Sequence, residues 1–188
     1  MTRIIAGAIG SLQLKPAAKA TRPTSDRVKE SLFAKLDAMG AIEGAKVLDL
    51  FAGTGALGLE SASRGAESVD LVERDRNAFD LLQQNVKSSL SSLAKQEIAI
   101  KIQAHNQDAQ RFIKSSTGSF ELVFVDPPYE FPNSDLEELV ESVAGLLSDD
   151  GLVVVERSSR SEPLDIESLK LQSSKTYGDT AVWIYEKP

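Results

Sequence analysis

The sequence contains no cysteine, a single histidine and a single tryptophan, and it has no long apolar run. Without cysteine, the chain has no disulfide framework, no zinc site with cysteine ligands and no thiol nucleophile. No segment approaches the roughly 18 consecutive apolar residues of a membrane-spanning helix, and residues 1–7 are not followed by the apolar region of a signal peptide. We therefore expect a cytoplasmic protein that does not enter a membrane.

Charge is distributed unevenly along the 188 residues. Hydrophobic residues make up 41% and charged residues 26%, which is ordinary for one soluble domain with a buried core. The net charge is −7, but residues 1–35 hold seven basic and two acidic side chains, a balance of +5, so the remainder carries −12. A basic arm on an acidic body indicates contact with a polyanion such as nucleic acid. A chance excess of Lys and Arg on a solvated segment is the alternative.

One stretch organises the rest of the chain: an apolar run over 47–51, which carries Asp49 and leads into a glycine-rich turn. A helical pattern follows, so the stretch predicts a strand, a tight turn and a helix, as at the start of a nucleotide-binding α/β unit. Gly53 and Gly55 omit Cβ atoms where a ligand can approach the backbone, and Gly58 lets the helix pack close to the strand. The spacing also fits G-x-G-x-x-G, which predicts a dinucleotide as readily as another ligand.

Beyond this stretch, strand patterns alternate with helical patterns, which predicts a doubly wound, mostly parallel α/β sheet. The expected strands cover residues 47–51, 68–73, 98–103, 120–125, 151–156, 169–176 and 181–186, and the expected helices cover residues 55–64, 77–90, 108–114 and 136–147. A strand or small hairpin between Arg3 and Leu14 precedes them, followed by a helix that begins near Asp26. The nearly all-apolar run 120–125 is typical of a central parallel strand.

Polar residues stand where the predicted strands end, which is the edge at which open α/β sheets bind ligands. Glu73 ends the second strand of the predicted sheet, 24 residues beyond Asp49. A carboxylate at about this spacing commonly binds ribose hydroxyls, and a solvated charge at a strand end is the alternative for Glu73. Asn106 and Asp108 follow the third strand and add polar groups at the same edge.

The segment Asp126-Pro127-Pro128-Tyr129 is the most specific signal in the sequence. Two prolines fix the backbone and remove N–H donors, so a rigid carbonyl lies beside the Asp126 carboxylate. Two neighbouring acceptors suit a planar NH₂ group, which has two donors, and the aromatic ring offers a face on which a base can stack. The segment therefore predicts a site for an exocyclic amine, and a loop that merely stops a strand is the alternative.

This segment resembles the [DNS]-PP-[YFW] motif of S-adenosylmethionine-dependent amino-methyltransferases, and Asp49-x-Phe51-x-Gly53-Thr54-Gly55 resembles their cofactor loop. Residues 22–33, together with residues 3–7 and 177–180, are similar to the RsmD-type 16S rRNA guanine-N2 methyltransferases, and the resemblance covers nearly the whole chain. It implies a Rossmann-like class I methyltransferase sheet of seven strands with the last antiparallel, preceded by a small hairpin and helix extension. It implies a basic N-terminal extension over 1–40 that contacts RNA and a methyltransferase domain over 41–188.

The resemblance also implies roles for individual residues. Contacts with S-adenosylmethionine are expected at Asp49, Phe51, Ala52, Gly53, Thr54 and Gly55, with its ribose at Glu73 and Arg74 and its adenine at Asp108 and Ala109. The residues expected to hold the guanine are Asp126, Pro127, Pro128 and Tyr129. The residues expected to close over the site or to contact RNA are Arg3, Arg22, Thr24 and Arg27.

The implied activity is methyl transfer from S-adenosylmethionine to the N2 amine of a guanine in 16S rRNA. The expected substrate is the small ribosomal subunit, with naked rRNA as the alternative, and a monomer is the default oligomeric state. Asp126 and the Pro127 carbonyl would accept the amine hydrogens of an unpaired guanine, and the nitrogen would attack the methyl group of the sulfonium. This mechanism requires no metal ion. An N6-adenine nucleic-acid methyltransferase is an alternative that shares the motifs. An NAD-dependent oxidoreductase shares the glycine loop and Glu73, but it leaves residues 126–129 and the basic arm unexplained. A non-catalytic RNA-binding module would need no carboxylates at the strand ends.

Overall fold

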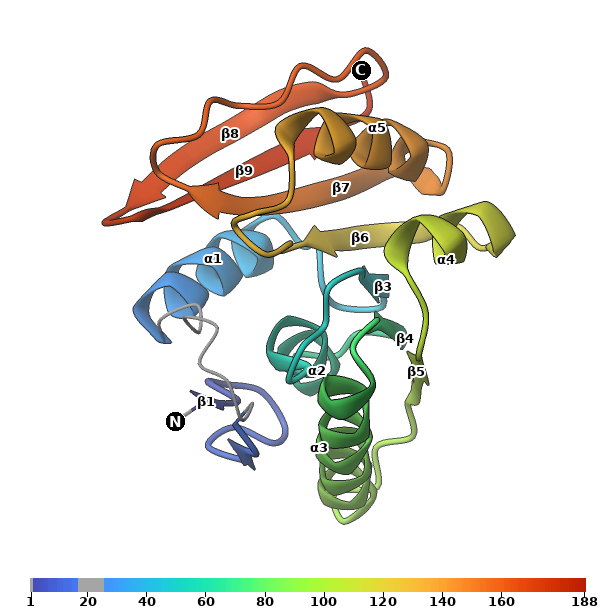
Figure 1. Ribbon diagram of the computed structural model, residues 1–188. Coiled ribbons are helices and arrows are strands. Elements are labelled where there is room, and N and C mark those ends of the chain that lie inside the picture. The colour runs from blue at the N-terminus through green and yellow to red at the C-terminus, as the bar shows by residue number, and fades with distance from the viewer. Residues whose placement is uncertain (1, 17–25) are drawn as a thin grey trace.

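A seven-stranded sheet forms the middle layer of the molecule, and helices cover both of its faces (Figure 1). The structure is a computed structural model that describes residues 2–16 and 26–188. Its strands are β1 (Thr2–Arg3), β2 (Gln13–Leu14), β3 (Lys46–Asp49), β4 (Ser68–Val72), β5 (Lys101–His105), β6 (Phe120–Val125), β7 (Leu147–Ser158), β8 (Lys170–Tyr177) and β9 (Thr180–Glu186). Its helices are α1 (Asp26–Ala38), α2 (Ala56–Ser63), α3 (Arg76–Ala94), α4 (Ala109–Ser115) and α5 (Asn133–Ala144).

The strand order in the large sheet is β5-β4-β3-β6-β7-β9-β8, and β1 and β2 form a separate antiparallel hairpin. The five strands from β5 to β7 in this order run parallel, whereas β9 is antiparallel to both β7 and β8. The predicted fold class is therefore confirmed, including the antiparallel last strand and the small N-terminal hairpin. The apolar strand β6 lies beside β3 near the centre, with Val47 opposite Leu122 and Asp49 opposite Phe124.

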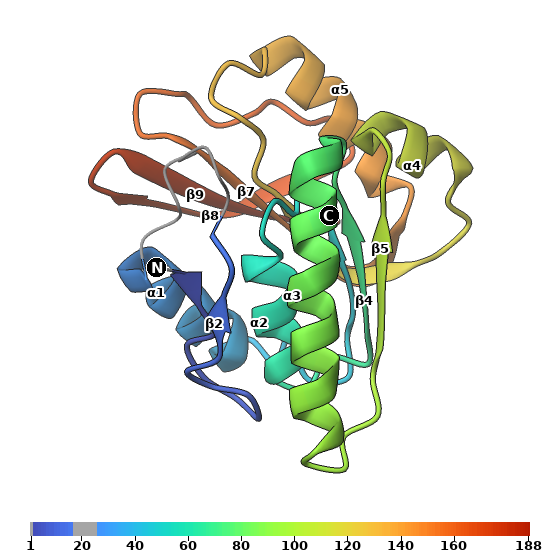
Figure 2. The same ribbon diagram turned by 60° about the horizontal axis from the view of Figure 1, so that its bottom comes forward.

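Alternate residues of the central strands contribute to two separate hydrophobic cores. Leu122 and Phe124 belong to the core under α1, α2 and α3, whereas Val123 and Val125 belong to the core under α4 and α5. Helix α2 packs on β3 and β4, and α3 packs on β5, as Figure 2 shows from below. Because both faces of β6 are covered, its residues are apolar at nearly every position, and its carboxyl end is held firmly in place.

The N-terminal hairpin is joined to α2 through the fully buried Glu60. The Glu60 carboxylate accepts hydrogen bonds from the backbone N–H groups of Ile5, at 2.6 Å, and Ala6, at 3.1 Å. Arg64 Nε also donates to it at 2.8 Å, and Lys29 Nζ lies 3.8 Å from its other oxygen. Burial lowers the pKa of Lys29, and the neighbouring Glu60 opposes that shift. The hairpin, α1 and α2 are therefore joined by one buried group of charges.

Several boundaries differ from the sequence-based expectation, and two of the differences have a clear physical reason. Leu147, predicted to end a helix, begins β7 and pairs with Phe120 of β6, because its apolar side chain suits a buried strand as well as a helix face. The strand predicted over 98–103 is β5, which starts at Lys101. The N–H of Ile98 instead donates to the carbonyl of Leu93 at 3.1 Å and closes the end of α3, so the ladder begins later.

Candidate functional site

The parallel strands bring three of the predicted carboxylates to one edge of the sheet. Asp49 of β3 pairs with Leu71 of β4 and with Phe124 of β6. Glu73 and Asp126 each stand two residues beyond these partners, so both lie just past the carboxyl ends of strands that flank β3. This edge is where open α/β sheets bind ligands, and it is the candidate site.

Glycines shape the turn between β3 and α2. Gly53 and Gly55 have φ angles of 52° and 83°, in the left-handed region that glycine adopts readily. The N–H of Gly53 donates to Glu73 Oε2 at 2.9 Å. A Cβ atom added to Gly58 would lie 2.3 Å from Leu71 Cδ2, so α2 reaches its observed distance from β4 because residue 58 is a glycine. The expected close packing of helix and strand at Gly58 is confirmed.

Asp49 is a buried carboxylate with one satisfied oxygen. Its side chain is 1% exposed, and Oδ2 accepts a hydrogen bond from the N–H of Gly58 at 3.2 Å. Its Oδ1 has no hydrogen-bond partner within residues 2–16 and 26–188. Burial raises the pKa of Asp49 to about 7, with a further contribution from Glu73, against the backbone N–H groups of Gly58 and Phe51. A ligand that brings a donor or a positive charge to Oδ1 fits this site.

Glu73 closes the glycine loop against the end of β4. Its Oε2 accepts from Gly53, and its Oε1 accepts from the N–H of Asp75 at 2.7 Å. Each carboxylate oxygen can accept two hydrogen bonds, so both oxygens keep capacity for ribose hydroxyls. The neighbouring Arg74 is exposed. The predicted role of these two residues at the ribose stays a prediction, and the geometry leaves room for it.

The loop after β5 lies beside the loop after β4. Asn106 Nδ2 donates to the carbonyls of Glu73 and Arg74, at 2.9 and 3.1 Å. Asp108 caps α4 by accepting from two backbone N–H groups of that helix, at 3.0 and 3.4 Å, and Ala109 is buried as the first residue of the helix. Asp108 and Ala109, which follow β5, therefore lie at the same edge of the sheet as Glu73, which follows the neighbouring strand β4.

Asp126 is half-buried just beyond β6 and has charged neighbours on two adjacent strands. Burial raises the pKa of Asp126 well above its ordinary value, and the carboxylates of Glu156 and Asp49 raise it further. The guanidinium of Arg157, near the end of β7, lowers it. Three carboxylates therefore lie at this edge, next to Arg157. They are Asp49 of β3, Glu156 of β7 and Asp126 of the loop after β6.

The segment after Asp126 forms a tight loop that exposes an aromatic ring. The carbonyl of Pro128 accepts from the N–H of Phe131 at 2.9 Å and closes the loop. The Phe131 ring packs edge-on against Phe51, with ring centroids 5.6 Å apart, so the loop after β6 is joined to the loop after β3. The Tyr129 side chain is 47% exposed beside them and is free to stack on a base.

Of the four predicted RNA-contacting residues, the structure describes Arg3, in the hairpin, and Arg27, in the first turn of α1. Arg3 Nε lies 3.3 Å from Asp26 Oδ2, so the hairpin and the first residue of α1 form an ion pair. Arg27 is exposed. Arg22 and Thr24 lie outside the described residues.

Two polar residues at the site were missed by the sequence analysis. Asn85 of α3 is buried; its Oδ1 accepts from the N–H of Lys15 at 2.8 Å, and its Nδ2 donates to the carbonyl of Thr54 at 2.9 Å. It thereby joins the end of the hairpin to the glycine loop. Arg157 contacts the loop after β6. Two signals were available in the sequence. Asn85 is a polar residue three positions after Leu82 on an apolar helix face, and Arg157 directly follows an apolar strand.

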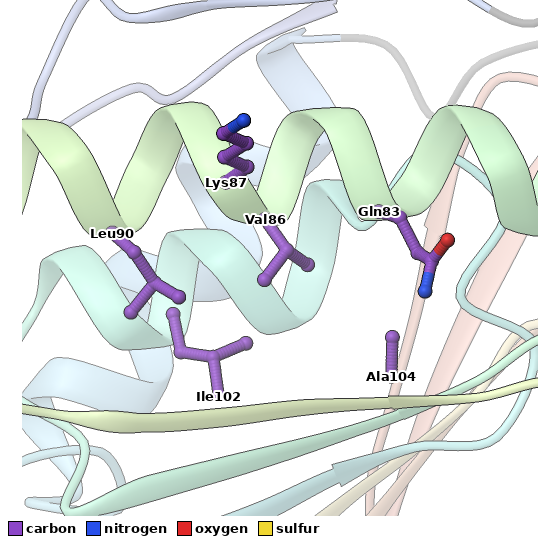
Figure 3. A pocket seen from close by; sticks show the side chains of 6 residues that line it. All are labelled: Gln83, Val86, Lys87, Leu90, Ile102 and Ala104. Carbon is purple, nitrogen blue, oxygen red and sulfur yellow. The ribbon is translucent and has the colours of Figure 1, made fainter.

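A hollow of about 320 Å³ lies between α3 and β5 (Figure 3). It is lined by Gln83, Val86, Lys87, Leu90, Ile102 and Ala104. Lys87 is the one ionisable side chain among them, so the hollow offers little chemistry. In the part of the chain that the structure describes, no group of three His, Cys, Asp or Glu side chains is placed to hold a metal ion, and no helix has the length and apolarity to cross a membrane.

Comparison with known proteins adds to this geometry. The family model described as conserved hypothetical protein 95 matches residues 2–186. The chain is 38% identical to the protein YlbH of Bacillus subtilis (strain 168), over 98% of both chains. It is 34% identical to the ribosomal RNA small subunit methyltransferase D of Escherichia coli (strain K12), over 98% of this chain and 89% of that protein. The solved structure of a hypothetical protein of Thermus thermophilus, TTHA0928, matches with a TM-score of 0.82 at 28% identity, over 99% of both chains.

Proposed function

The chain belongs to the family described as conserved hypothetical protein 95, the RsmD family expected from the sequence, and from this premise we propose that it methylates ribosomal RNA. The reaction transfers a methyl group from S-adenosylmethionine to the N2 amine of a guanine in the 16S rRNA of the small ribosomal subunit. The observation that carries the proposal is that Asp126, after β6, and the glycine loop, after β3, lie at the same edge of the sheet because β3 and β6 are parallel neighbours. The enzyme acts in the cytoplasm as a monomer.

The residues at this edge fit S-adenosylmethionine. The buried Oδ1 of Asp49 has no partner among the described residues, and a Cβ atom added to Gly53 would come no closer than 4.0 Å to a described atom, so this side of the loop has room for a ligand. The expectation that Gly55 does the same is wrong, because a Cβ atom there would lie 2.8 Å from Leu82 and 2.9 Å from Leu59, on the core side of the loop. The proposed contacts are Asp49, Phe51, Ala52, Gly53, Thr54 and Gly55, then Glu73 and Arg74 at the ribose, and Asp108 and Ala109 at the adenine. When bound, S-adenosylmethionine supplies an electrophilic methyl group on a positively charged sulfur.

Residues 126–129 hold the amine that receives the methyl group. The carboxylate of Asp126 and the carbonyl of Pro127 accept its two N–H hydrogens, which keeps the nitrogen lone pair directed at the methyl group. The ring of Tyr129 stacks on the guanine. No residue needs to abstract a proton before the attack, so the catalytic effect comes from positioning and electrostatics. Once the nitrogen carries the methyl group, its surplus proton passes to the Asp126 carboxylate. Asp126 accepts at full strength only as an anion, so activity falls as pH decreases through its raised pKa.

The N-terminal extension, residues 1–40, contacts the RNA, and residues 41–188 carry the transfer site. Arg3, Arg22, Thr24 and Arg27 meet phosphates near the modified guanine, which leaves its helix or loop to enter the site. Because phosphate contacts release counterions, the affinity for RNA decreases with rising salt. The buried contact of Glu60 with Ile5 and Ala6 keeps this extension at a fixed place next to the domain.

The test is methyl transfer from labelled S-adenosylmethionine to small ribosomal subunits that lack the modification, with naked rRNA and double-stranded DNA alongside. The expected product is N2-methylguanosine in 16S rRNA. If label appears only in N6-methyladenine, the proposed mechanism stands but guanine is rejected as the target base. Binding of S-adenosylmethionine without any transfer would reject the substrate and leave the cofactor site standing.

A pair of variants separates the role of Asp126 from general damage. Asp126→Ala should abolish transfer and leave the Kd for S-adenosylmethionine within a few-fold of the wild-type value. The matched control is Asp149→Ala, which removes a fully exposed carboxylate from the opposite end of β7 and should leave transfer unchanged. Loss of cofactor binding together with transfer in Asp126→Ala would reject the assignment of Asp126 to the amine.

A further inference from the structure

Arg157 is a buried arginine whose guanidinium points at the loop after β6. Its side chain is 5% exposed. Nη1 donates to the carbonyl of Pro128 at 3.2 Å, and Nη2 donates to the carbonyl of Phe131 at 2.9 Å. Nη2 also donates to Oδ1 of Asn133, at 2.9 Å, where α5 begins. Three acceptors within six consecutive residues therefore converge on one buried cation.

Arg157 makes these hydrogen bonds to the loop although one of its own N–H donors stays unpaired. Arg157 Nε is buried and, among residues 2–16 and 26–188, donates to nothing. A buried unpaired N–H is unfavourable, so the guanidinium is oriented by the loop and not by the satisfaction of all its donors. The Asp126 carboxylate, at the start of the same loop, attracts the buried cation and supplies the opposite charge that it needs.

We propose that Arg157 is a positioning residue for methyl transfer: it holds the backbone of residues 126–133 in the shape that sets the Asp126 carboxylate and the Pro127 carbonyl against the substrate amine. This inference rests on the proposed function. The carbonyl of Pro128 lies one peptide unit after that of Pro127, and prolines at both positions fix two φ angles. The only freely rotatable bond between the Pro127 carbonyl and the Pro128 carbonyl is therefore the ψ bond of Pro128, so holding the Pro128 carbonyl restricts the direction of the Pro127 carbonyl.

A lysine could not replace this arginine. The planar guanidinium presents its donors in a rigid fork, whereas an ammonium is a point charge on a flexible stem. Arg157→Lys therefore keeps the positive charge next to Asp126 but loses the two-armed contact with the loop. Arg157→Met loses both. The two variants separate the geometric effect of Arg157 from its electrostatic effect.

The experiment measures four quantities on the full chain: kcat and KM with small ribosomal subunits, the Kd for S-adenosylmethionine, the pH dependence of kcat, and hydrogen exchange in a peptide that spans residues 126–133. Arg64→Met is the control, because it also removes a largely buried arginine but one that pairs with Glu60 far from this loop. Asn133→Ala is a milder variant at an exposed position that removes only one of the contacts of Arg157.

In Arg157→Lys and Arg157→Met we expect kcat to fall by about 10²-fold, the size of effect that a misplacement of about 1 Å produces. We expect the Kd for S-adenosylmethionine to stay within twofold, and exchange in residues 126–133 to accelerate. In Arg157→Met only, the fall of kcat on the acidic side of its pH profile (the acid limb) should move to higher pH. The reason is that Glu156 and Asp49 then face Asp126 without the opposing cation. Asn133→Ala should give smaller changes of the same kind, and Arg64→Met should leave loop exchange and the acid limb unchanged.

Unchanged loop exchange in Arg157→Met and Asn133→Ala would overturn the proposal, as would equal acceleration in Arg64→Met. If Arg157→Met does not fold, Arg157→Lys and Asn133→Ala still decide the outcome through exchange and kcat. Loop exchange needs no substrate. If the wild-type protein methylates no RNA, the proposed function fails, while the exchange data still show separately whether Arg157 holds the loop.

Discussion

Replacing Asp49 with asparagine should stabilise the protein near neutral pH. The pKa of Asp49 is about 7 in the folded chain, because of its burial, against an ordinary value of 3.8. Since the folded pKa is raised, the folded state binds more protons than the unfolded state between these values. The resulting stability is full below pH 3.8 and is lost as pH rises through about 7. At about 1.4 kcal/mol per pKa unit, the complete loss is about 4 kcal/mol.

The asparagine in Asp49→Asn does not titrate and avoids this loss. Its side-chain oxygen can take the position of Oδ2 and accept from the N–H of Gly58, as the aspartate does at 3.2 Å. Its NH₂ group takes the position of Oδ1, an oxygen to which no described residue donates, and leaving that group unpaired costs about 1–3 kcal/mol. The free energy of unfolding of the variant at pH 8 should therefore exceed the wild-type value by about 1–3 kcal/mol.

Urea unfolding of both proteins at pH 5 and pH 8 checks this reasoning. The difference in unfolding free energy between variant and wild type should change by about 2.5 kcal/mol between the two pH values, in favour of the variant at pH 8. The same variant should bind S-adenosylmethionine at least about tenfold more weakly, a loss of about 1.4 kcal/mol. A variant that is less stable than wild type at pH 8, or a difference that does not depend on pH, would refute the argument.

Three other variants test separate features. Glu60→Gln should lower the free energy of unfolding by about 2–4 kcal/mol. One acceptor becomes a donor that faces a backbone N–H, and the buried Lys29 loses its opposite charge. A urea midpoint equal to that of wild type would contradict this prediction. Gly58→Ala should lower the free energy of unfolding by about 1–3 kcal/mol, since the new methyl group would overlap Leu71, and thermal unfolding measures this; an increased Tm would mean that helix propensity outweighs the overlap. Tyr129→Ala should leave stability within about 0.5 kcal/mol and reduce kcat/KM for the RNA substrate by about tenfold or more, through lost stacking; unchanged kinetics would remove Tyr129 from the site.

The sheet could be predicted because its pattern is local. The apolar run 120–125 and the glycine turn after Asp49 each specify their own conformation, and parallel pairing then places their ends together. The position of Asp126 next to Asp49 follows from this topology alone. The start of β7 could not be predicted, because Leu147 suits a helix face and a buried strand equally well, and only its pairing with Phe120 decides between them.

The missed residues depend on partners that are distant in the sequence. Glu60 looks like an exposed charge in the middle of a helix, yet it is fully buried because the backbone at Ile5 covers it. Asn85 and Arg157 look like ordinary polar residues until their acceptors, the carbonyls of Thr54 and Pro128, are known. Backbone carbonyls carry no sequence signal, so side chains that bind them are found only from the fold.

The strand order also determines when the site can exist while the chain is being made. The glycine loop is held by Glu73 after β4 and by Asn85 of α3, whereas the loop after β6 is held by Arg157 of β7, and β7 lies between β6 and β9, the last strand described. At about 5–20 residues per second, the 60 residues from Asp126 to Glu186 take about 3–12 s to synthesise. During that interval a nascent chain can carry a finished glycine loop, the proposed cofactor site, without a finished loop after β6, the proposed guanine site. Activity should therefore appear late in translation, after β9 has left the ribosome and paired.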